Sequence, residues 1–147
     1  MKNLQKRLST IILLVNSSTA FADPAVKHAV IEELREISRI ANLQPLNRRR
    51  LLAVLHLARS LETSLRAVVE SNGIVVEEKK RSMGGYLNAL AAHTPPLLNH
   101  SVKHNCIRDV TKVRNRIAHA AGNYPRDDNL VEATAQAAHA CLSLILR

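Results

Sequence analysis

Aromatic residues are almost absent from this chain, which has three in 147 positions (Phe21, Tyr86 and Tyr124) and no tryptophan. A core without rings has to be aliphatic, which suits helices packed on helices better than sandwiches or barrels, whose strands favour aromatic and β-branched residues. The same scarcity argues against a module that stacks splayed bases on aromatic side chains.

Several features that mark common functional classes are also missing. No apolar run reaches the roughly 20 residues of a membrane-spanning helix, so no transmembrane anchor is expected. There is no glycine-rich phosphate loop and no nucleophile elbow. His100 and His104 lack a third ligand in the nearby sequence, so neither a metal nor another cofactor is expected. Cys106 and Cys141 match no metal-binding or redox spacing and are expected as buried residues, which pair only in an exported protein.

What the chain has in excess is positive charge. Lys and Arg number 21 against 12 Asp and Glu, a formal net charge of +9. A basic surface attracts polyanions such as nucleic acids and anionic lipids, although the same charge also serves to keep a helical protein soluble. The charge alone does not decide between these roles.

Apolar residues recur at helical spacing through most of the chain. Five segments show this pattern, and no segment alternates as a strand would: residues 25–42, 48–70, 77–92, 97–121 and 128–147. We therefore expect one all-α domain over residues 23–147, a four- to five-helix up-down bundle. The first helix is expected to pack on this bundle or on a second protomer.

Two local features of these helices lead to further predictions. Glu62 has Arg59 at i−3 and Arg66 at i+4, so we expect a locally paired carboxylate. Gly84-Gly85 interrupts the pattern of residues 77–92, and a close contact between helices is the expected reason.

The first 22 residues allow two interpretations. Residues 8–15 form a short apolar run, and residues 20–22 have the small side chains that a signal peptidase reads; basic residues precede the run at Lys2, Lys6 and Arg7. On this interpretation cleavage falls between Ala22 and Asp23, and the protein is exported. Alternatively the segment is an additional amphipathic helix of a cytoplasmic protein, because Asp23-Pro24 is by itself a typical helix start.

The helix expected at 97–121 carries polar residues that core packing does not require. Arg114, Asn115 and His119 lie within two turns, and Asn115 and His119 share a face at i and i+4. A neutral imidazole can take a proton from a ribose 2′-OH, an imidazolium can give one to the leaving 5′-oxygen, and a guanidinium binds phosphate oxygens. These residues therefore suit RNA cleavage without a metal ion. Taken alone, the spacing also fits an arginine at the core edge and a solvated histidine.

The stretch RNRIAHAAG, residues 114–122, resembles the signature of the HEPN superfamily, an all-helical group. The motif of that group is an arginine, a polar residue that is commonly asparagine, a few further residues and a histidine. The resemblance covers roughly residues 45–147: a long aliphatic helix comes first, a helix containing SMGGYLNAL follows, and a small-residue turn separates the motif from one last helix.

This resemblance implies a metal-independent endoribonuclease, often a toxin or an anti-phage defence effector, whose site forms between the subunits of a homodimer. Arg114 and His119 would be the catalytic pair and Asn115 would assist them. RNA would be the substrate, and an antitoxin or inhibitor protein would be a further partner. Further candidates for binding RNA are Arg108, Arg116, His104 and Lys112.

Two alternatives stay open at this point. Some members of the superfamily have lost catalysis and only bind RNA or protein partners. An exported helical protein with an accidental match to the motif is the other alternative. One subgroup carries a tyrosine two residues after the histidine, and Ala121 at that position does not support the modification-controlled antitoxin scheme tied to it.

Overall fold

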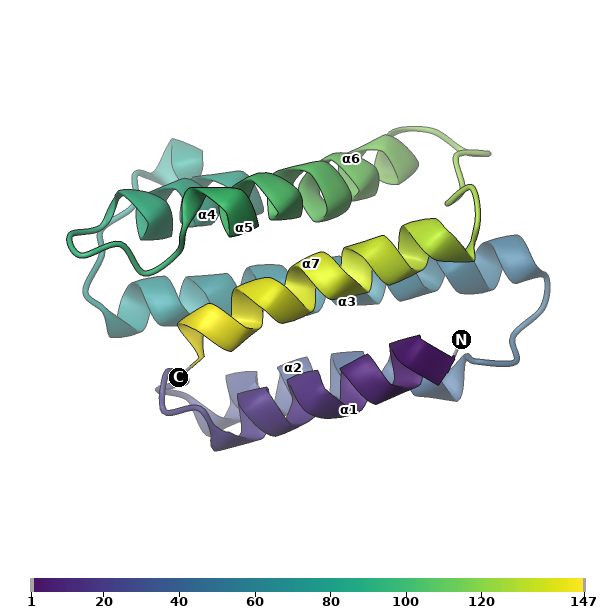
Figure 1. The fold of residues 1–147 in the computed structure, drawn as a ribbon, viewed down its shortest axis with the longest axis horizontal. Helices are drawn as coiled ribbons and strands as arrows, with labels where there is room; N and C mark the ends of the chain where they lie inside the picture. Colours follow the sequence, from purple (N-terminus) through teal and green to yellow (C-terminus); the bar gives the residue numbers. More distant parts are fainter. Residues whose placement is uncertain (1, 147) are drawn as a thin grey trace.

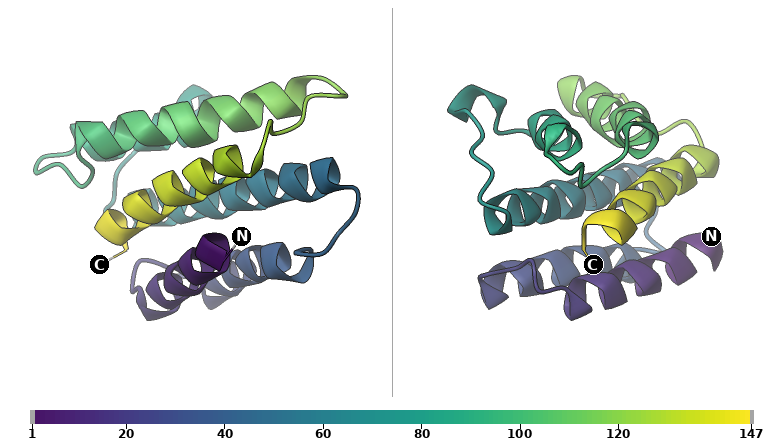
Figure 2. Two further views of the ribbon diagram at one scale, coloured as in Figure 1. Left: turned by 45° about the vertical axis from the view of Figure 1, so that its right-hand side comes forward. Right: turned by 60° about the vertical axis from the view of Figure 1, so that its left-hand side comes forward.

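The structure, a computed structural model, describes residues 2–146 and is helical throughout, without a strand among these residues. Figures 1 and 2 show the helices in three layers, with α3 and α7 between the other two. The helices and two short helical segments are α1 Lys2–Ser17, α2 Pro24–Arg39, α3 Leu46–Ser71, η1 Glu78–Lys80, α4 Met83–Ala92, α5 His100–Cys106, η2 Ile107–Thr111, α6 Lys112–His119 and α7 Asp128–Ile145. The all-α prediction is confirmed.

The middle layer contributes the largest share of the core. Buried leucines of α3 pack against α7, which contributes mainly small residues and thereby allows a close approach. One outer layer consists of α1 and α2, and the other consists of α4 with the helix that runs from α5 to α6 (Figure 1). Phe21 and Tyr86 are the only aromatic residues buried among the residues that the structure describes, and the core is mainly aliphatic, as the composition predicts.

The N-terminal segment forms α1, one helix more than the five expected from residues 23–147. Leu4, Leu8, Ile11 and Val15 are fully buried, and their spacing of four, three and four residues places them on one face. This face contacts both α2 and α7. Such packing is expected of an additional amphipathic helix, and cleavage after Ala22 stays a prediction. None of the described helices has the length and apolar character needed to cross a membrane.

The helix expected at 97–121 runs from His100 to His119 and contains a π-helical turn, η2. The Lys112 amide donates to the Ile107 carbonyl, five residues back rather than four. One extra residue in a turn rotates everything upstream by about 100° relative to an uninterrupted α-helix. A single helical wheel drawn through residues 97–121 is therefore wrong across η2. Ala121, expected on the apolar stripe, lies beyond the helix and is exposed.

The segment expected as a helix over residues 77–92 is helical in its second half only. Residues 74–77 are extended, η1 follows, and α4 begins at Met83 after the N-cap Ser82. Gly84 and Gly85 therefore lie in the first turn rather than in mid-helix. A Cβ on Gly85 would collide with the Lys80 carbonyl of η1, whereas nothing lies within 4 Å of a Cβ on Gly84. The close approach that requires glycine is thus to a neighbouring loop and not to another helix.

Candidate functional site

The three motif residues lie on α6, the last eight residues of the long helix. Ile117 is the buried anchor of α6, and the side chains of Arg114, Asn115 and His119 are all exposed. Thr134 of α7 fixes the preceding turn, because its buried hydroxyl lies 2.7 Å from the Asp109 carbonyl oxygen in η2. The motif is therefore presented to solvent from a helix that is held to the core at both η2 and Ile117.

Arg114 is not neutralised by a carboxylate among the described residues. Its one hydrogen bond is donated from Nη1 to Oδ1 of Asn115, at 3.1 Å. Asn115 is a neutral partner, so the guanidinium keeps its full charge, and its other N–H groups are left for a ligand. A guanidinium in this state suits the bidentate binding of a phosphate group.

His119 is the last residue of α6, where the chain turns away into the loop before α7. Its imidazole makes no hydrogen bond or ion pair with the residues that the structure describes. The loop is held to the helix end by Asn123, whose Nδ2 donates to the Arg116 carbonyl at 2.9 Å. On one helix, side chains five residues apart point about 140° away from each other and are separated by about 7.5 Å along the axis. Arg114 and His119 of a single chain therefore do not form a compact pair.

A small hollow of about 140 Å³ adjoins Arg114 and Asn115. Its other lining residues come from α3, from the start of α4 and from η2: Glu62, Ser82, Met83, Gly84 and Thr111. Thr111 donates to the Met83 sulfur at 3.1 Å, which closes the hollow on one side. The hollow thus brings the motif face of α6 together with the N-terminus of α4.

Glu62 is the residue of this hollow that sequence reasoning placed wrongly. Its Oε1 accepts a hydrogen bond from the Met83 amide at 3.0 Å, so it caps α4, and no ion pair to Arg59 or Arg66 forms. Arg59 instead lies 3.1 Å from Glu33 of α2. A carboxylate at the N-terminus of a helix is stabilised by the unpaired amides and by the helix dipole. Spacing along α3 alone does not reveal a partner 21 residues away.

The further candidates for RNA binding divide into two groups. Arg108 forms a two-pronged ion pair with Asp109, at 3.0 and 2.8 Å, and this contact raises the pKa of the guanidinium. Its donors are thus partly used, and it lies within the π turn η2 rather than on α6 with the motif. Lys112, Arg116 and His104 are exposed, and none of them is bonded to a carboxylate among the described residues.

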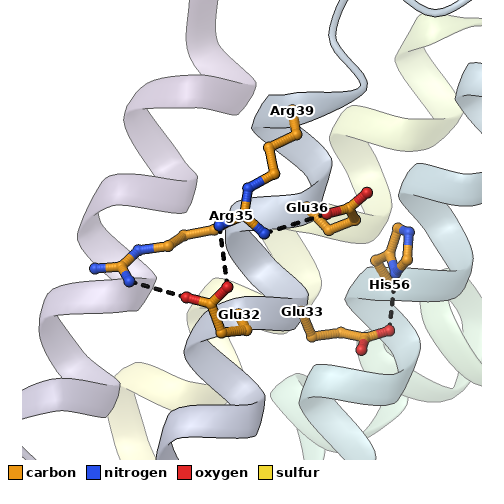
Figure 3. Close-up of polar contacts among 6 residues, drawn as sticks. All are labelled: Glu32, Glu33, Arg35, Glu36, Arg39 and His56. Carbon is orange, nitrogen blue, oxygen red and sulfur yellow. Dashed lines mark hydrogen bonds and ion pairs between the residues drawn. The ribbon is translucent and has the colours of Figure 1, made fainter.

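A cluster of charged side chains lies elsewhere, along α2 (Figure 3). Arg39 binds Glu32 at 3.0 Å and Glu36 at 3.2 Å, and Arg35 binds Glu32 at 3.0 Å. Hydrogen bonds from Arg39 and then Arg35 lower the pKa of Glu32, and the bond to Glu32 raises the pKa of Arg39. All these groups are on the surface and satisfy one another, so the cluster is a structural ion-pair network.

The cysteines and histidines build no metal site in the described part of the chain. Cys106 and Cys141 are fully buried, as predicted, and both are free thiols. The hydrogen bond with Cys106, together with burial, raises the pKa of the Cys141 thiol, so Cys141 is not poised as a thiolate nucleophile.

Comparisons of the chain with protein-family models, with curated proteins and with solved structures found no match. A function for this protein is therefore inferred from the geometry of α6 and from the resemblance of its motif.

Proposed function

We propose that this protein is a metal-independent endoribonuclease of the HEPN type. The observation that carries the proposal is the state of Arg114: an exposed guanidinium with no carboxylate partner, on the same short helix as an exposed histidine. Arg108, by contrast, is paired with the carboxylate of Asp109. The motif on α6 instead exposes the guanidinium donors of Arg114, the amide of Asn115 and the imidazole of His119 to solvent.

The chemistry needs only these side chains and the RNA. Neutral His119 takes the proton of a ribose 2′-OH while O2′ attacks the adjacent phosphorus, and the bond between phosphorus and the 5′-oxygen breaks. An imidazolium returns a proton to that leaving oxygen, which yields a 2′,3′-cyclic phosphate and a 5′-hydroxyl end. Arg114 binds the non-bridging oxygens, whose charge grows in the transition state. Asn115 holds the guanidinium through its amide oxygen.

A second copy of α6 would supply the pairing that one copy lacks. In a twofold dimer each patch meets the same patch of the partner, so Arg114 of one subunit can approach His119 of the other. One subunit separates the two groups by about 140° around the helix. We therefore place the site across a homodimer contact formed by the exposed face of α6.

Cleavage of RNA in excess EDTA tests the activity. We expect 2′,3′-cyclic phosphate products from the full chain and a loss of at least about 100-fold in His119→Ala and Arg114→Ala, the usual range for a general acid–base or a charge-stabilising group. His28→Ala and Arg66→Ala are matched controls, because both residues are exposed. His28 is on α2, which has no contact with α6, and Arg66 of α3 borders a different hollow from the one beside Arg114. Cleavage that persists in the α6 variants, or that vanishes equally in the controls, contradicts the proposal.

A mixing experiment tests the composite site separately. Neither inactive variant alone can form a complete site, but a mixed dimer of Arg114→Ala and His119→Ala holds one intact Arg–His pair across the twofold axis. With equal amounts and free exchange, about a quarter of the full activity should return. Recovery near zero, in a mixture shown to exchange subunits, would mean that both groups act within one subunit.

A non-catalytic RNA-binding module is the second candidate. The net charge of +9 and the exposed Lys112, Arg116 and His104 favour it as much as they favour the enzyme. Salt-sensitive RNA binding with no cyclic-phosphate product would select it. A toxin or defence role, an inhibitor protein as partner and a cytoplasmic location follow only if RNA is cleaved.

A further inference from the structure

A second cationic site lies far from α6 along the chain, between α1 and α7. Arg7 of α1 donates from Nη1 to Nδ1 of His139 on α7, at 3.0 Å. An arginine offers donors only, so Nδ1 of His139 has to be the acceptor, and the ring proton of a neutral imidazole is then on Nε2. The contact therefore joins a cation to a neutral imidazole, and the charge of Arg7 is not cancelled.

These two residues border a hollow of about 220 Å³ that has no acidic residue in its lining. The remaining lining residues are Asn3, Lys6 and Thr10. Neither Lys6 nor Arg7 forms an ion pair with any described carboxylate. Two permanent cations, an imidazole, an amide and a hydroxyl thus face one space that is large enough for about seven water molecules.

The surroundings of Arg7 leave one of its hydrogen-bond donors unsatisfied. Its Nε is enclosed by the protein and has no hydrogen-bond partner, and a buried donor without an acceptor destabilises a fold. Burial, followed by the nearby Arg7 cation, lowers the pKa of His139. The unpaired Nε opposes the placement of Arg7 at this position, and no described carboxylate balances the charge of its guanidinium. A bound anion would supply the missing counter-charge.

We propose that the hollow between α1 and α7 binds a phosphate dianion, either as free phosphate or as the terminal phosphate monoester of a small molecule. Lys6 and Arg7 supply two positive charges, which match a monoester of charge −1.5 to −2 better than a phosphodiester of charge −1. The Nη2 and Nη1 groups of Arg7 and the Lys6 ammonium are the donors available to such an anion, since the Thr10 hydroxyl already donates to the Lys6 carbonyl at 3.1 Å. This site is independent of the proposed ribonuclease activity.

The test is a titration of the full-length protein with inorganic phosphate at pH 7.5 and constant ionic strength, followed through the ring signals of His139. We expect saturable shifts and a rise in the pH at which His139 titrates, because the anion screens the imidazole from Lys6 and Arg7. Lys6→Gln, an exposed change, should weaken phosphate binding at least fivefold. Lys79→Gln, an equally exposed change in η1, should leave it unaltered.

Three results would overturn the proposal. The first is a His139 signal that does not respond to phosphate at tens of millimolar. The second is equal binding by the full chain and Lys6→Gln. The third is a stronger response to an oligoribonucleotide without terminal phosphates, since this would assign the hollow to the diester backbone. A phosphate monoester of a nucleoside that binds more tightly than free phosphate would support the small-molecule source.

Discussion

Removal of the first 22 residues should prevent the rest of the chain from folding as it does in the full protein. The truncation deletes five buried apolar side chains: Leu4, Leu8, Ile11, Val15 and Phe21. Each fully buried residue of this kind contributes about 1.5–3 kcal/mol, so the set contributes about 8–15 kcal/mol. Whole domains are stable by about 5–15 kcal/mol, so the loss is as large as the total. The newly exposed faces of α2 and α7 would also favour aggregation.

A matched pair of point variants measures the same effect without deleting chain. Leu8 is 1% exposed and Leu13, five residues on in the same helix, is 65% exposed. We expect Leu8→Ala to lower the free energy of unfolding by about 2–5 kcal/mol and Leu13→Ala to change it by less than about 0.5 kcal/mol. Urea denaturation followed by circular dichroism gives both values.

The prediction that α1 is needed for folding is wrong if the chain that begins at Asp23 unfolds with the midpoint and cooperativity of the full protein. Equal effects of Leu8→Ala and Leu13→Ala would refute it as well. Either result would mean that α1 is not part of the cooperative core. The truncated chain is also what signal-peptide cleavage would produce, so the experiment shows directly whether that product keeps the fold.

Three further predictions concern single positions. Gly85→Ala should destabilise the protein by about 1–3 kcal/mol because its Cβ meets the Lys80 carbonyl, while Gly84→Ala, with open space around its Cβ, should stabilise it by up to about 1 kcal/mol in the same denaturation assay. Thr134→Val should lower the free energy of unfolding by about 1–3 kcal/mol, because it removes the hydrogen bond to the Asp109 carbonyl. A lower urea midpoint for this variant than for the wild type is the check. The pKa of His139 is lowered in the fold, so the unfolded chain binds the proton more readily, and stability should fall as the pH drops below about 6.5. His139→Gln keeps an acceptor for Arg7 and should lose this part of the pH dependence, measured as urea midpoints between pH 7.5 and 5.5 in chloride buffers without phosphate. An unchanged slope in His139→Gln would show that another group causes the loss.

The helical class and most element boundaries were predictable because they depend on local signals. Asp23 caps α2 through a hydrogen bond to the Ala25 amide, and Asp127 caps α7 through one to the Leu130 amide. Both lie where the sequence pattern begins its helices. The missing aromatic residues predicted an aliphatic core, and the core has this composition. Helix caps and composition depend on residues that are close together in the sequence, so both can be predicted without knowing the tertiary fold.

The features that escaped prediction depend on contacts between distant segments. A π turn has no clear local signal. The apolar residues Leu98, Val102, Cys106 and Val110 follow one another at intervals of four, which is longer than the α-helical period of about 3.6 residues and is the one indication of it in the sequence. Glu62 finds its partner on α4 and Arg7 finds its partner on α7, at separations of 21 and 132 residues. The basic residues at the start of the chain predict a leader signal, and that prediction stays open. The contact of Arg7 with His139 cannot be read from the same residues, because it depends on a segment at the other end of the chain.

The distribution of acids explains why both proposed sites lie where they do. The acids of α2, Glu32, Glu33 and Glu36, are bound to cations of α2 and α3. By contrast, α1, α5 and α6 contain basic residues and no Asp or Glu. The excess of positive charge is therefore not spread evenly, since it collects on helices that cannot neutralise it themselves. Each proposed site places these unpaired cations beside a histidine, and both sites predict anion binding that weakens as the salt concentration rises. If RNA and phosphate binding prove insensitive to salt, unpaired charge is not what recognises either ligand.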